Sequence, residues 1–444
     1  MDYITKEKLE NYRECFSKDI KNKMSMNAVM NNNLDKVASN SDVIKANRNE
    51  FSVSLEQGDI TDQKMSGRCW MFASLNIMRY EVIKKLNLDN FEFSQSYPLF
   101  FDKLEKSNYF LEAVLDNLDE PLNGRLMTHL LFSPLNDGGQ WDMFCNIVKK
   151  YGAVPKDAMP ECISSSRTRE MNYYLTSKLR QFACSLREKH ECGADEHELR
   201  EIKNEMMYDI YKILCICLGE PPETVDFEIR DKNKNFIRDL HITPKEFFDK
   251  YVGWQLDDYI SLINAPTSDK PFGRSFTVKY LGNVREGKPV RYLNMESKYL
   301  KEAAIAQLAD GRPVWFGADV DHGMMVQEGI FDPNAYQADL IFGTDFDMTK
   351  EQRLNYGHSM MNHAMVFMGV NINEDGRPDR WRVENSWGKE KGKEGYYIMS
   401  DDWFDEYVFQ VVVNKKYLPP ELLDYYRQEP IVLEPWDPMG SLAD

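Results

Sequence analysis

Four residues in two distant parts of the chain have the types and the order that nucleophilic cysteine chemistry requires. Cys69 follows a polar, glycine-containing segment and opens a mostly apolar segment that is typical of a buried helix. In the first turn of a helix, the backbone N–H groups and the helix dipole favour an anion, so the thiol can ionise near neutral pH. His363 could exchange a proton with this thiolate, Asn385 could orient the imidazole, and Gln63 could donate to an oxyanion.

The spacing of these residues fits their proposed roles. Gln63 lies six residues before Cys69, and Asn385 lies 22 residues after His363, a span suited to two neighbouring antiparallel strands and their connection. Trp387 could shield the bond between His363 and Asn385 from water. Each feature alone has a plainer interpretation, since buried cysteines are usually inert packing and Asn-Ser-Trp-Gly is an ordinary turn. The agreement of four patterns in one order is what predicts catalysis.

The segment from Gln63 to Ala73 reads Gln-Lys-x-Ser-Gly-Arg-Cys-Trp-x-Phe-Ala. It resembles the active-site segment of papain-like cysteine peptidases, and in particular their intracellular branch of bleomycin hydrolase and bacterial aminopeptidase C. Ser66 stands where the secreted papain pattern carries another cysteine, a difference that removes a disulfide partner and leaves the nucleophile untouched. The resemblance implies a papain-like α+β fold, with a helical half and a strand-rich, barrel-like half facing across a cleft.

The same resemblance implies an activity. It is that of a cysteine aminopeptidase, which removes N-terminal residues through an acyl-enzyme, and it extends to amide hydrolysis of the bleomycin hydrolase type. No metal or other cofactor is implied. The partners implied are peptides with a free N-terminus and further copies of the chain in a homohexamer.

Candidate substrate-binding residues lie in three further places. Gly138 and Gly139 mark a tight turn, and glycine also lets a peptide backbone approach as an added strand. In papain-like peptidases a Gly-Gly pair at the corresponding place binds substrate backbone. Asn362, which precedes the histidine, and Trp387 are assigned to the same cleft by the resemblance.

The last sixteen residues, 429–444, contain three prolines and no helical period, so a free end is the plain expectation. In the family that the chain resembles, such an arm instead enters the cleft, where its terminal carboxylate pairs with the α-amino group of the substrate. Ala443 and Asp444 would then contact the substrate. Asp444 is an addition to family forms that end at alanine.

Length and composition allow two or three domains, or one enlarged by insertions. The candidate histidine follows the cysteine by 294 residues rather than by the roughly 130 to 150 of the papain pattern, so a large insertion is expected between them. We therefore expect an N-terminal arm and helix, a helical half with the nucleophile, a helical insertion, a strand-rich half with the histidine and asparagine, and a C-terminal arm in the cleft, over residues 1–50, 51–166, 167–260, 261–418 and 419–444.

Charge and cysteine usage narrow the functional classes. The net charge of −17, from 55 basic and 72 acidic residues, gives no support for nucleic-acid binding or for attachment to an anionic membrane. No stretch is apolar enough to span a bilayer, and the N-terminus lacks the apolar core of a secretory signal. The eight cysteines show no metal-ligand spacing. We expect them to be reduced thiols in the cytoplasm.

Two other functional classes are compatible with parts of the pattern. An endopeptidase paralogue would share every catalytic residue and differ in the tail or the cleft. A non-catalytic peptide-binding protein would keep the cleft without hydrolysis, which the presence of all four catalytic-type residues argues against. Transglutaminase-like acyl transfer typically uses an aspartate as third residue, so Asn385 argues against that class.

Overall fold

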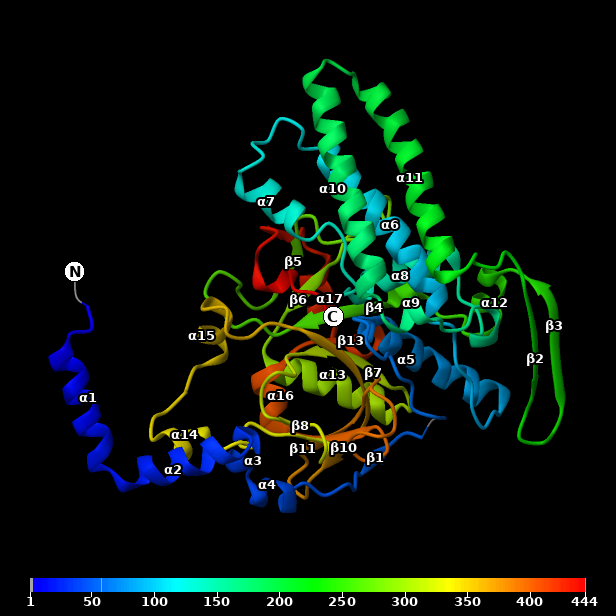
Figure 1. The fold of residues 1–444 in the computed structure, drawn as a ribbon. Helices are drawn as coiled ribbons and strands as arrows, with labels where there is room; N and C mark the ends of the chain where they lie inside the picture. Colours follow the sequence, from blue (N-terminus) through cyan, green and yellow to red (C-terminus); the bar gives the residue numbers. More distant parts are fainter. Residues whose placement is uncertain (1–2, 57, 444) are drawn as a thin grey trace.

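The computed structural model describes residues 3–56 and 58–443. Its centre is helix α5 (Cys69–Leu86), which packs on the strands β7 (Val314–Ala318) and β10 (His363–Ile372) and on helix α8 (Trp141–Tyr151). Helices gather on one side of α5 and a large sheet lies on the other (Figure 1). This arrangement confirms the predicted α+β fold with a helical half and a strand-rich half.

Helix α5 is buried over most of its length because its sequence is apolar almost all around. Thirteen of its eighteen residues are buried, and Asn87 ends the helix in a left-handed conformation with φ of 53°. The other helices of this half are α6 (Ser96–Leu115), α7 (Arg125–Phe132), α9 (Ile163–Ser166) and the 3-10 turn η1 (Lys156–Ala158). The nucleophile therefore lies at the end of a rigid central element.

An N-terminal arm of short helices precedes this half. The first two bury no side chain and extend away from the body of the molecule (Figure 1). The fourth contributes Val43 to a small apolar cluster with Met325, Ile330 and Ala335. The arm consists of α1 (Lys6–Lys18), α2 (Ile20–Asn31), α3 (Leu34–Ala38) and α4 (Ser41–Ala46).

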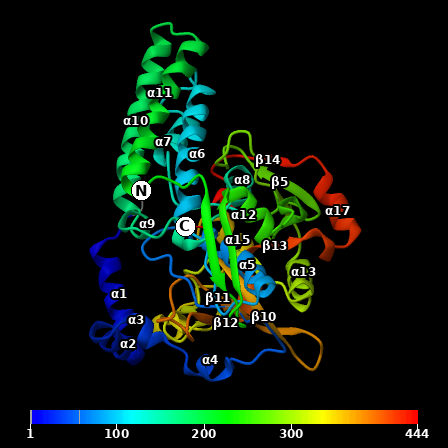
Figure 2. The same cartoon turned by 90° about the vertical axis from the view of Figure 1, so that its right-hand side faces the viewer.

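A long antiparallel helical hairpin, α10 (Arg169–Glu191) and α11 (Glu196–Leu218), follows the helical half and packs on α6. Figure 2 shows it projecting from the body as a tower. The helical prediction for residues 167–260 is wrong beyond this hairpin, because β2 (Val225–Arg230) and β3 (Phe236–Ile242) form a two-stranded ribbon. Its alternating apolar residues, with Val225 and Phe227 buried, favour strand over helix. Helix α12 (Pro244–Tyr251) follows and is capped by the side chain of Thr243.

The strand-rich half is one mixed sheet whose main hydrogen-bonded order is β14-β5-β6-β4-β13-β7-β10-β11-β12-β9-β8, with β1 added on β10. Strands β7 and β10 are antiparallel, and His363 pairs with Ala318. The remaining strands are β1 (Val53–Ser54), β4 (Tyr259–Ile263), β5 (Arg274–Val278), β6 (Tyr292–Asn294), β8 (Met324–Met325), β9 (Ile330–Phe331), β11 (Pro378–Glu384), β12 (Tyr396–Ser400), β13 (Val408–Asn414) and β14 (Ile431–Leu433).

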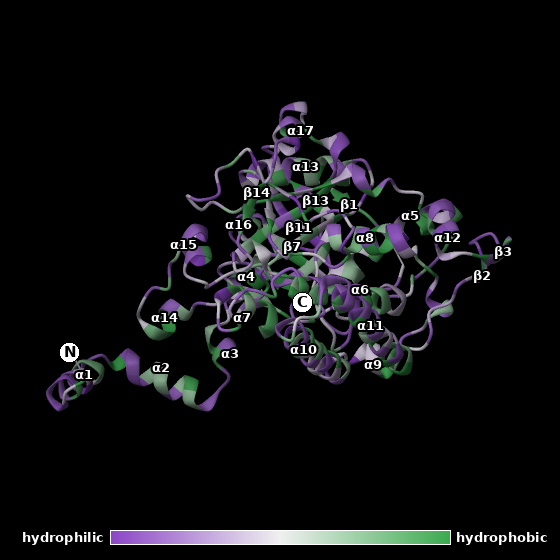
Figure 3. Cartoon of the chain, turned by 90° about the horizontal axis from the view of Figure 1, so that it is seen from above, coloured by the Kyte–Doolittle hydropathy of each residue, from purple (hydrophilic) through white to green (hydrophobic). Residues whose placement is uncertain are grey.

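Several helices and turns surround the sheet. They are α13 (Ser297–Ala309), α14 (Ala338–Phe342), α15 (Lys350–Asn355), α16 (Asp401–Tyr407) and α17 (Pro420–Arg427), with the 3-10 turns η2 (Leu256–Asp258), η3 (Lys415–Tyr417) and η4 (Pro438–Gly440). The view from above shows hydrophilic and hydrophobic segments alternating along the helices of the arm and of the tower (Figure 3). None of the helices in the described part of the chain is long and apolar enough to cross a membrane.

Candidate active site

Cys69 is the first residue of α5 and is fully buried. Its Sγ accepts a hydrogen bond from the backbone N–H of Ala364 at 3.4 Å. Since Ala364 follows His363 at the start of β10, the thiol lies where the central helix meets the sheet. The next residue, Trp70, is also fully buried, and its indole N–H donates to the carbonyl of Asp137 at 2.8 Å. The nucleophile is thus fixed at a helix N-terminus, where a thiolate is favoured.

The predicted histidine and asparagine are in contact. His363 Nε2 lies 2.9 Å from Asn385 Oδ1, and both side chains are buried. An imidazole nitrogen bonded to an amide oxygen carries the proton, which leaves Nδ1 as the atom that can exchange a proton with the thiol. The Trp387 ring lies 4.8 Å from the imidazole, centre to centre, and is tilted by 39°. Trp387 therefore covers the bonded pair, as its position in the sequence indicates.

Burial lowers the pKa of His363 to about 4, and the hydrogen bond with Asn385 acts in the opposite direction. A lone imidazolium is therefore disfavoured at this position, because a charge loses its hydration there. The charged ring needs a counter-ion, and the thiolate of Cys69 is the group that the site offers. The two residues are suited to carry charge together as an ion pair.

The amide of Gln63 is held at both ends. Its Nε2 donates to the carbonyl of Ser66 at 2.7 Å, and its Oε1 accepts from the hydroxyl of Ser386 at 2.7 Å. The backbone of Gln63 also donates to the carbonyl of Ser386 at 2.8 Å. An amide nitrogen carries two protons, so this orientation leaves one N–H of Gln63 for a further acceptor.

The C-terminal arm lies along the glycine pair. The N–H of Gly139 donates to the carbonyl of Ala443 at 3.1 Å, and the two residues pair as an isolated antiparallel bridge. Gln140 Nε2 donates to the carbonyl of Ser441 at 2.7 Å. Glycine is needed at 139 because a Cβ there would stand 2.4 Å from the buried ring of Trp70. Since Trp70 follows Cys69, Ala443 lies close to the nucleophile and is itself fully buried.

The arm also contacts the opposite wall. The hydroxyl of Ser441 donates to the carbonyl of Met361 at 2.5 Å, two residues before His363. Further back, Asp437 forms an ion pair with Lys270 at 2.9 Å, and the Trp436 ring stacks against the guanidinium of Arg125 at 4.0 Å. The arm is therefore held in place rather than free. Asp444, the other predicted contact, lies outside the described residues.

The side chain of Asn362 forms its hydrogen bonds with the residues that follow β7. Its side chain donates to Asp319 at 2.8 Å and accepts from the N–H of Val320 at 2.9 Å. Its own N–H donates to the carbonyl of Ala318. These bonds fix the start of β10 to the end of β7. The side chain of Asn362 therefore helps to hold His363 in place. The other glycine, Gly138, accepts from Lys106 at 2.6 Å through its carbonyl.

Sequence reasoning missed Asp137, which links the glycine pair to the nucleophile loop. Its carboxylate accepts from the N–H of Gly67 at 3.1 Å, from Asn172 at 2.7 Å and from Lys103 at 2.5 Å, and also from the hydroxyl of Thr168. Burial works to raise the pKa of Asp137, but Lys103 and the other donors outweigh it and hold this pKa below its ordinary value. The sequence feature that could have identified Asp137 is its position directly before the paired glycines.

All eight cysteines lie in the described residues, and each is a free thiol. Among residues 3–56 and 58–443, no cluster of three or more histidine, cysteine, aspartate or glutamate side chains is arranged to hold a metal ion. The side chains described above supply three functional groups. They comprise a thiol at a helix N-terminus, a histidine oriented by an asparagine, and an oriented amide donor.

The chain is similar to known proteins over nearly its whole length. It is 45% identical over 440 residues to aminopeptidase C of Listeria monocytogenes, a match that covers 99% of each chain, and 45% identical over 402 residues to human bleomycin hydrolase, covering 89% of this chain and 88% of the human protein. The crystal structure of PepW from Lactobacillus rhamnosis superposes with a TM-score of 0.98 at 48% identity, over 99% of both chains. The Peptidase C1-like family model matches residues 3–440, so the chain belongs to this family.

Proposed function

We propose that this chain is a cysteine aminopeptidase that removes N-terminal residues from peptides and that its C-terminal arm enforces this mode of cleavage. The family and the near-full-length likeness to aminopeptidase C support the enzyme class. The observation that carries the exopeptidase proposal is the pairing of Ala443 with Gly139 beside the nucleophile. The arm fills the part of the cleft that residues preceding the cleaved bond would need in a longer peptide.

The first half of the reaction forms an acyl-enzyme. The thiolate of Cys69 attacks the carbonyl carbon of the first peptide bond, and the resulting oxyanion accepts from the remaining N–H of Gln63 and from the backbone N–H of Cys69. As the C–N bond breaks, the imidazolium of His363 gives its proton to the leaving amine. The shortened peptide departs, and the N-terminal residue stays on sulfur as a thioester.

The second half regenerates the thiol. Neutral His363 takes a proton from a water molecule, and the hydroxide attacks the thioester. The tetrahedral species collapses to the free amino acid and the Cys69 thiolate, with His363 again charged beside it. Asn385 keeps the imidazole in one orientation through both halves, because its Oδ1 is fixed at 2.9 Å from Nε2. No metal or cofactor enters this sequence.

The terminal carboxylate of the chain supplies the selection. In the sequence it belongs to Asp444, the residue after Ala443, and Ala443 is bonded to Gly139. We expect it to pair with the free α-amino group of the substrate, because a carboxylate attracts an ammonium group more strongly than a blocked, neutral amide. Gly138, Gly139 and Trp387 would line the same cleft. Amide hydrolysis of the bleomycin hydrolase type is a second candidate reaction, favoured by the likeness to the human enzyme of that name.

We further propose that the chain works as a homohexamer in the cytoplasm. The helices α1 and α2 bury no side chain of their own and expose large apolar residues, including Leu9, Tyr12, Phe16, Ile20 and Met24. Such a surface favours contact with further copies of the chain.

The eight free thiols suit a reducing compartment. The net charge of −17 disfavours nucleic acid as a partner. Sedimentation of the intact chain and of a variant lacking residues 3–32 tests the assembly.

Matched reporter peptides test the proposed activity under reducing conditions. One carries a free N-terminus and its twin is acetylated, and both are given to the intact protein and to a variant that ends at Gly440, each also as Cys69→Ala. We expect the intact protein to cleave only the free peptide, the shortened variant to gain cleavage of the acetylated twin, and Cys69→Ala to abolish both. Equal cleavage of both peptides by the intact protein would establish an endopeptidase. Cleavage independent of Cys69 would overturn the proposal.

A further inference from the structure

An ion pair between a fully buried arginine and a partly buried glutamate involves the residue directly before the nucleophile. Arg68, fully buried and adjacent to Cys69, donates through both terminal nitrogens to Glu161, at 2.9 and 2.8 Å. Two hydroxyl groups hold the same carboxylate, those of Ser96 at 3.1 Å and Ser165 at 2.8 Å. Burial works to raise the pKa of Glu161, but these donors outweigh it and keep this pKa below its ordinary value. The Glu161 carboxylate is therefore ionised and held in one orientation.

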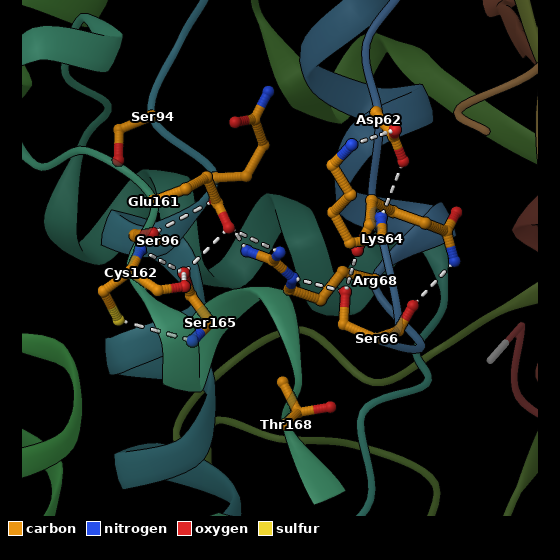
Figure 4. A network of polar contacts seen from close by, with 12 residues as sticks. Asp62, Lys64, Ser66, Arg68, Ser94, Ser96, Glu161, Cys162, Ser165 and Thr168 are labelled. Carbon is orange, nitrogen blue, oxygen red and sulfur yellow. Dashed lines mark hydrogen bonds and ion pairs between the residues drawn. The ribbon is translucent and has the colours of Figure 1, made fainter. Parts of the chain in front are cut away.

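The third donor of Arg68 reaches the oxyanion loop. Its Nε donates to the hydroxyl of Ser66 at 2.8 Å, and that hydroxyl donates to the carbonyl of Gln63 at 2.6 Å. In return, the Gln63 amide donates to the carbonyl of Ser66. Figure 4 shows Glu161, Arg68 and Ser66 in one line of contacts. Hydrogen bonds thus connect α6 and α9 with the Ser66 hydroxyl and the backbone carbonyl of Gln63, and the Gln63 side-chain amide is bonded to the same residue, Ser66.

We infer that Glu161, Arg68 and Ser66 are positioning residues that aim the Gln63 amide at the oxyanion. The inference rests on the proposed function, because it requires Gln63 to stabilise charge in the transition state. A bidentate guanidinium and carboxylate pair is stiff, so it can hold a loop that has little regular structure of its own. Small displacements of an aligned group are costly, since a shift of about 1 Å can reduce a rate by roughly 100-fold.

A purely structural ion pair would make a different prediction. It would support the fold around α5 and affect every step alike. A pair that acts through Gln63 affects only steps in which an oxyanion forms, and it loses its effect once the Gln63 amide is absent. Alkylation of Cys69 by iodoacetamide forms no oxyanion, so its rate separates the two cases.

The test is a double-mutant cycle measured on the free-amine reporter. The variants are Gln63→Ala, Ser66→Ala, Glu161→Gln and the two doubles that combine Gln63→Ala with each of the others. We expect Gln63→Ala to lower kcat by about 100- to 1,000-fold. Ser66→Ala and Glu161→Gln should lower kcat by about tenfold or more with KM little changed, and should add less than about twofold in the Gln63→Ala background. The alkylation rate of Cys69 should stay the same in all variants.

Ser66→Ala keeps the cycle informative if Glu161→Gln fails to fold, because it removes the link to the loop and leaves the ion pair intact. Glu112→Gln is the matched control. This carboxylate is buried and bound by Arg200 and Lys203, but its contacts lie on α11 and not on the nucleophile loop. It should lower stability and leave kcat unchanged.

Two outcomes overturn different statements. If Gln63→Ala keeps full activity, the oxyanion role in the proposed mechanism is wrong, and the positioning role fails with it. If Gln63→Ala is impaired but the effects of Ser66→Ala and Glu161→Gln multiply with it in full, the oxyanion role stands and the positioning role is wrong. Slower alkylation of Cys69 in Ser66→Ala would likewise contradict positioning through Gln63.

Discussion

The helical wall and the strand wall of the active site hold their functional residues by different means. On the helical wall, the loops around residues 63–68 and 136–140 have little regular structure, and ion pairs hold them, chiefly Arg68 with Glu161 and Lys103 with Asp137. On the strand wall, backbone hydrogen bonds between neighbouring strands hold the functional residues. His363 is fixed opposite Ala318 by the β7 and β10 ladder.

This difference predicts how each wall responds to substitution. A side chain on the strand wall can be shortened while the ladder keeps the backbone in place, so activity falls and stability changes little. On the helical wall, loss of one charge leaves its partner buried and unpaired, so activity and stability fall together. The ion pair of Arg79 and Glu384, at 3.2 Å and almost fully buried, joins the walls through α5 and β11.

The sharpest effect on the strand wall is expected from His363→Ala. Without an acid and base at this position, kcat/KM on the free-amine reporter should fall by at least about 1,000-fold. The midpoint of thermal unfolding should stay within a few degrees of the parent, because the strand register does not depend on the ring. Steady-state kinetics and calorimetry measure both. A large loss of stability would contradict the strand-wall description.

The matching change on the helical wall is Asp137→Ala. It leaves the ammonium group of Lys103 buried without its carboxylate and frees the N–H of Gly67, so we expect a loss of about 3 to 5 kcal/mol in the free energy of unfolding. Activity should fall as well, since Gly67 and the glycine pair move together. Urea denaturation measures the loss, and the isosteric Asp137→Asn should retain part of both. An active, fully stable Asp137→Ala variant would contradict the helical-wall description.

The pH dependence of stability isolates the buried histidine in the Cys69→Ala variant, which lacks the thiolate. His363 has a pKa of about 4 when folded and an ordinary value of 6.5 when unfolded, so the unfolded chain binds its proton more readily. The free energy of unfolding should therefore fall as the pH drops from 6.5 to 4, by about 3 kcal/mol, and this contribution should be flat below pH 4. In Cys69→Ala combined with His363→Gln, this part of the slope should disappear. An unchanged slope would refute the assignment.

The smallest of these effects is expected from Trp387→Ala. The ring covers the bond between His363 and Asn385 without taking part in it, so its loss exposes that bond to water. We expect kcat to fall by roughly fivefold, since a hydrogen bond contributes a net of about 1 kcal/mol and water would compete for this one. The more conservative Trp387→Phe should recover most of the rate. A loss as large as that of His363→Ala would instead assign the ring a direct role.

Sequence predicted the local elements well where local physics decides them. The start of α5 at Cys69 and the antiparallel strands that carry His363 and end beside Asn385 lie where turn residues, apolar patterns and spacing indicate. The ribbon at 225–242 was missed because its charged residues resemble those of the preceding helices.

The candidate site was predicted as a set of residue types but not as a network. Several partners of the buried polar groups lie far away along the chain, as with Ser386 for Gln63 and Glu161 for Arg68. Such pairings depend on the tertiary packing, so local patterns contain no signal for them. The position of the arm was expected from resemblance, because an irregular, proline-containing segment gives no physical reason by itself to enter a cleft.

The most direct test of the account is the reactivity of Cys69 as a function of pH. This reactivity depends on an ion pair between Cys69 from the helical wall and His363 from the strand wall. Alkylation by iodoacetamide is followed by mass spectrometry of the Cys69 peptide, with the exposed Cys15 and Cys192 as internal references. The account predicts that Cys69 reacts well below the ordinary thiol pKa of about 8.5 and that His363→Ala shifts its profile up toward the references. A Cys69 profile that coincides with the references and does not change in His363→Ala would contradict it.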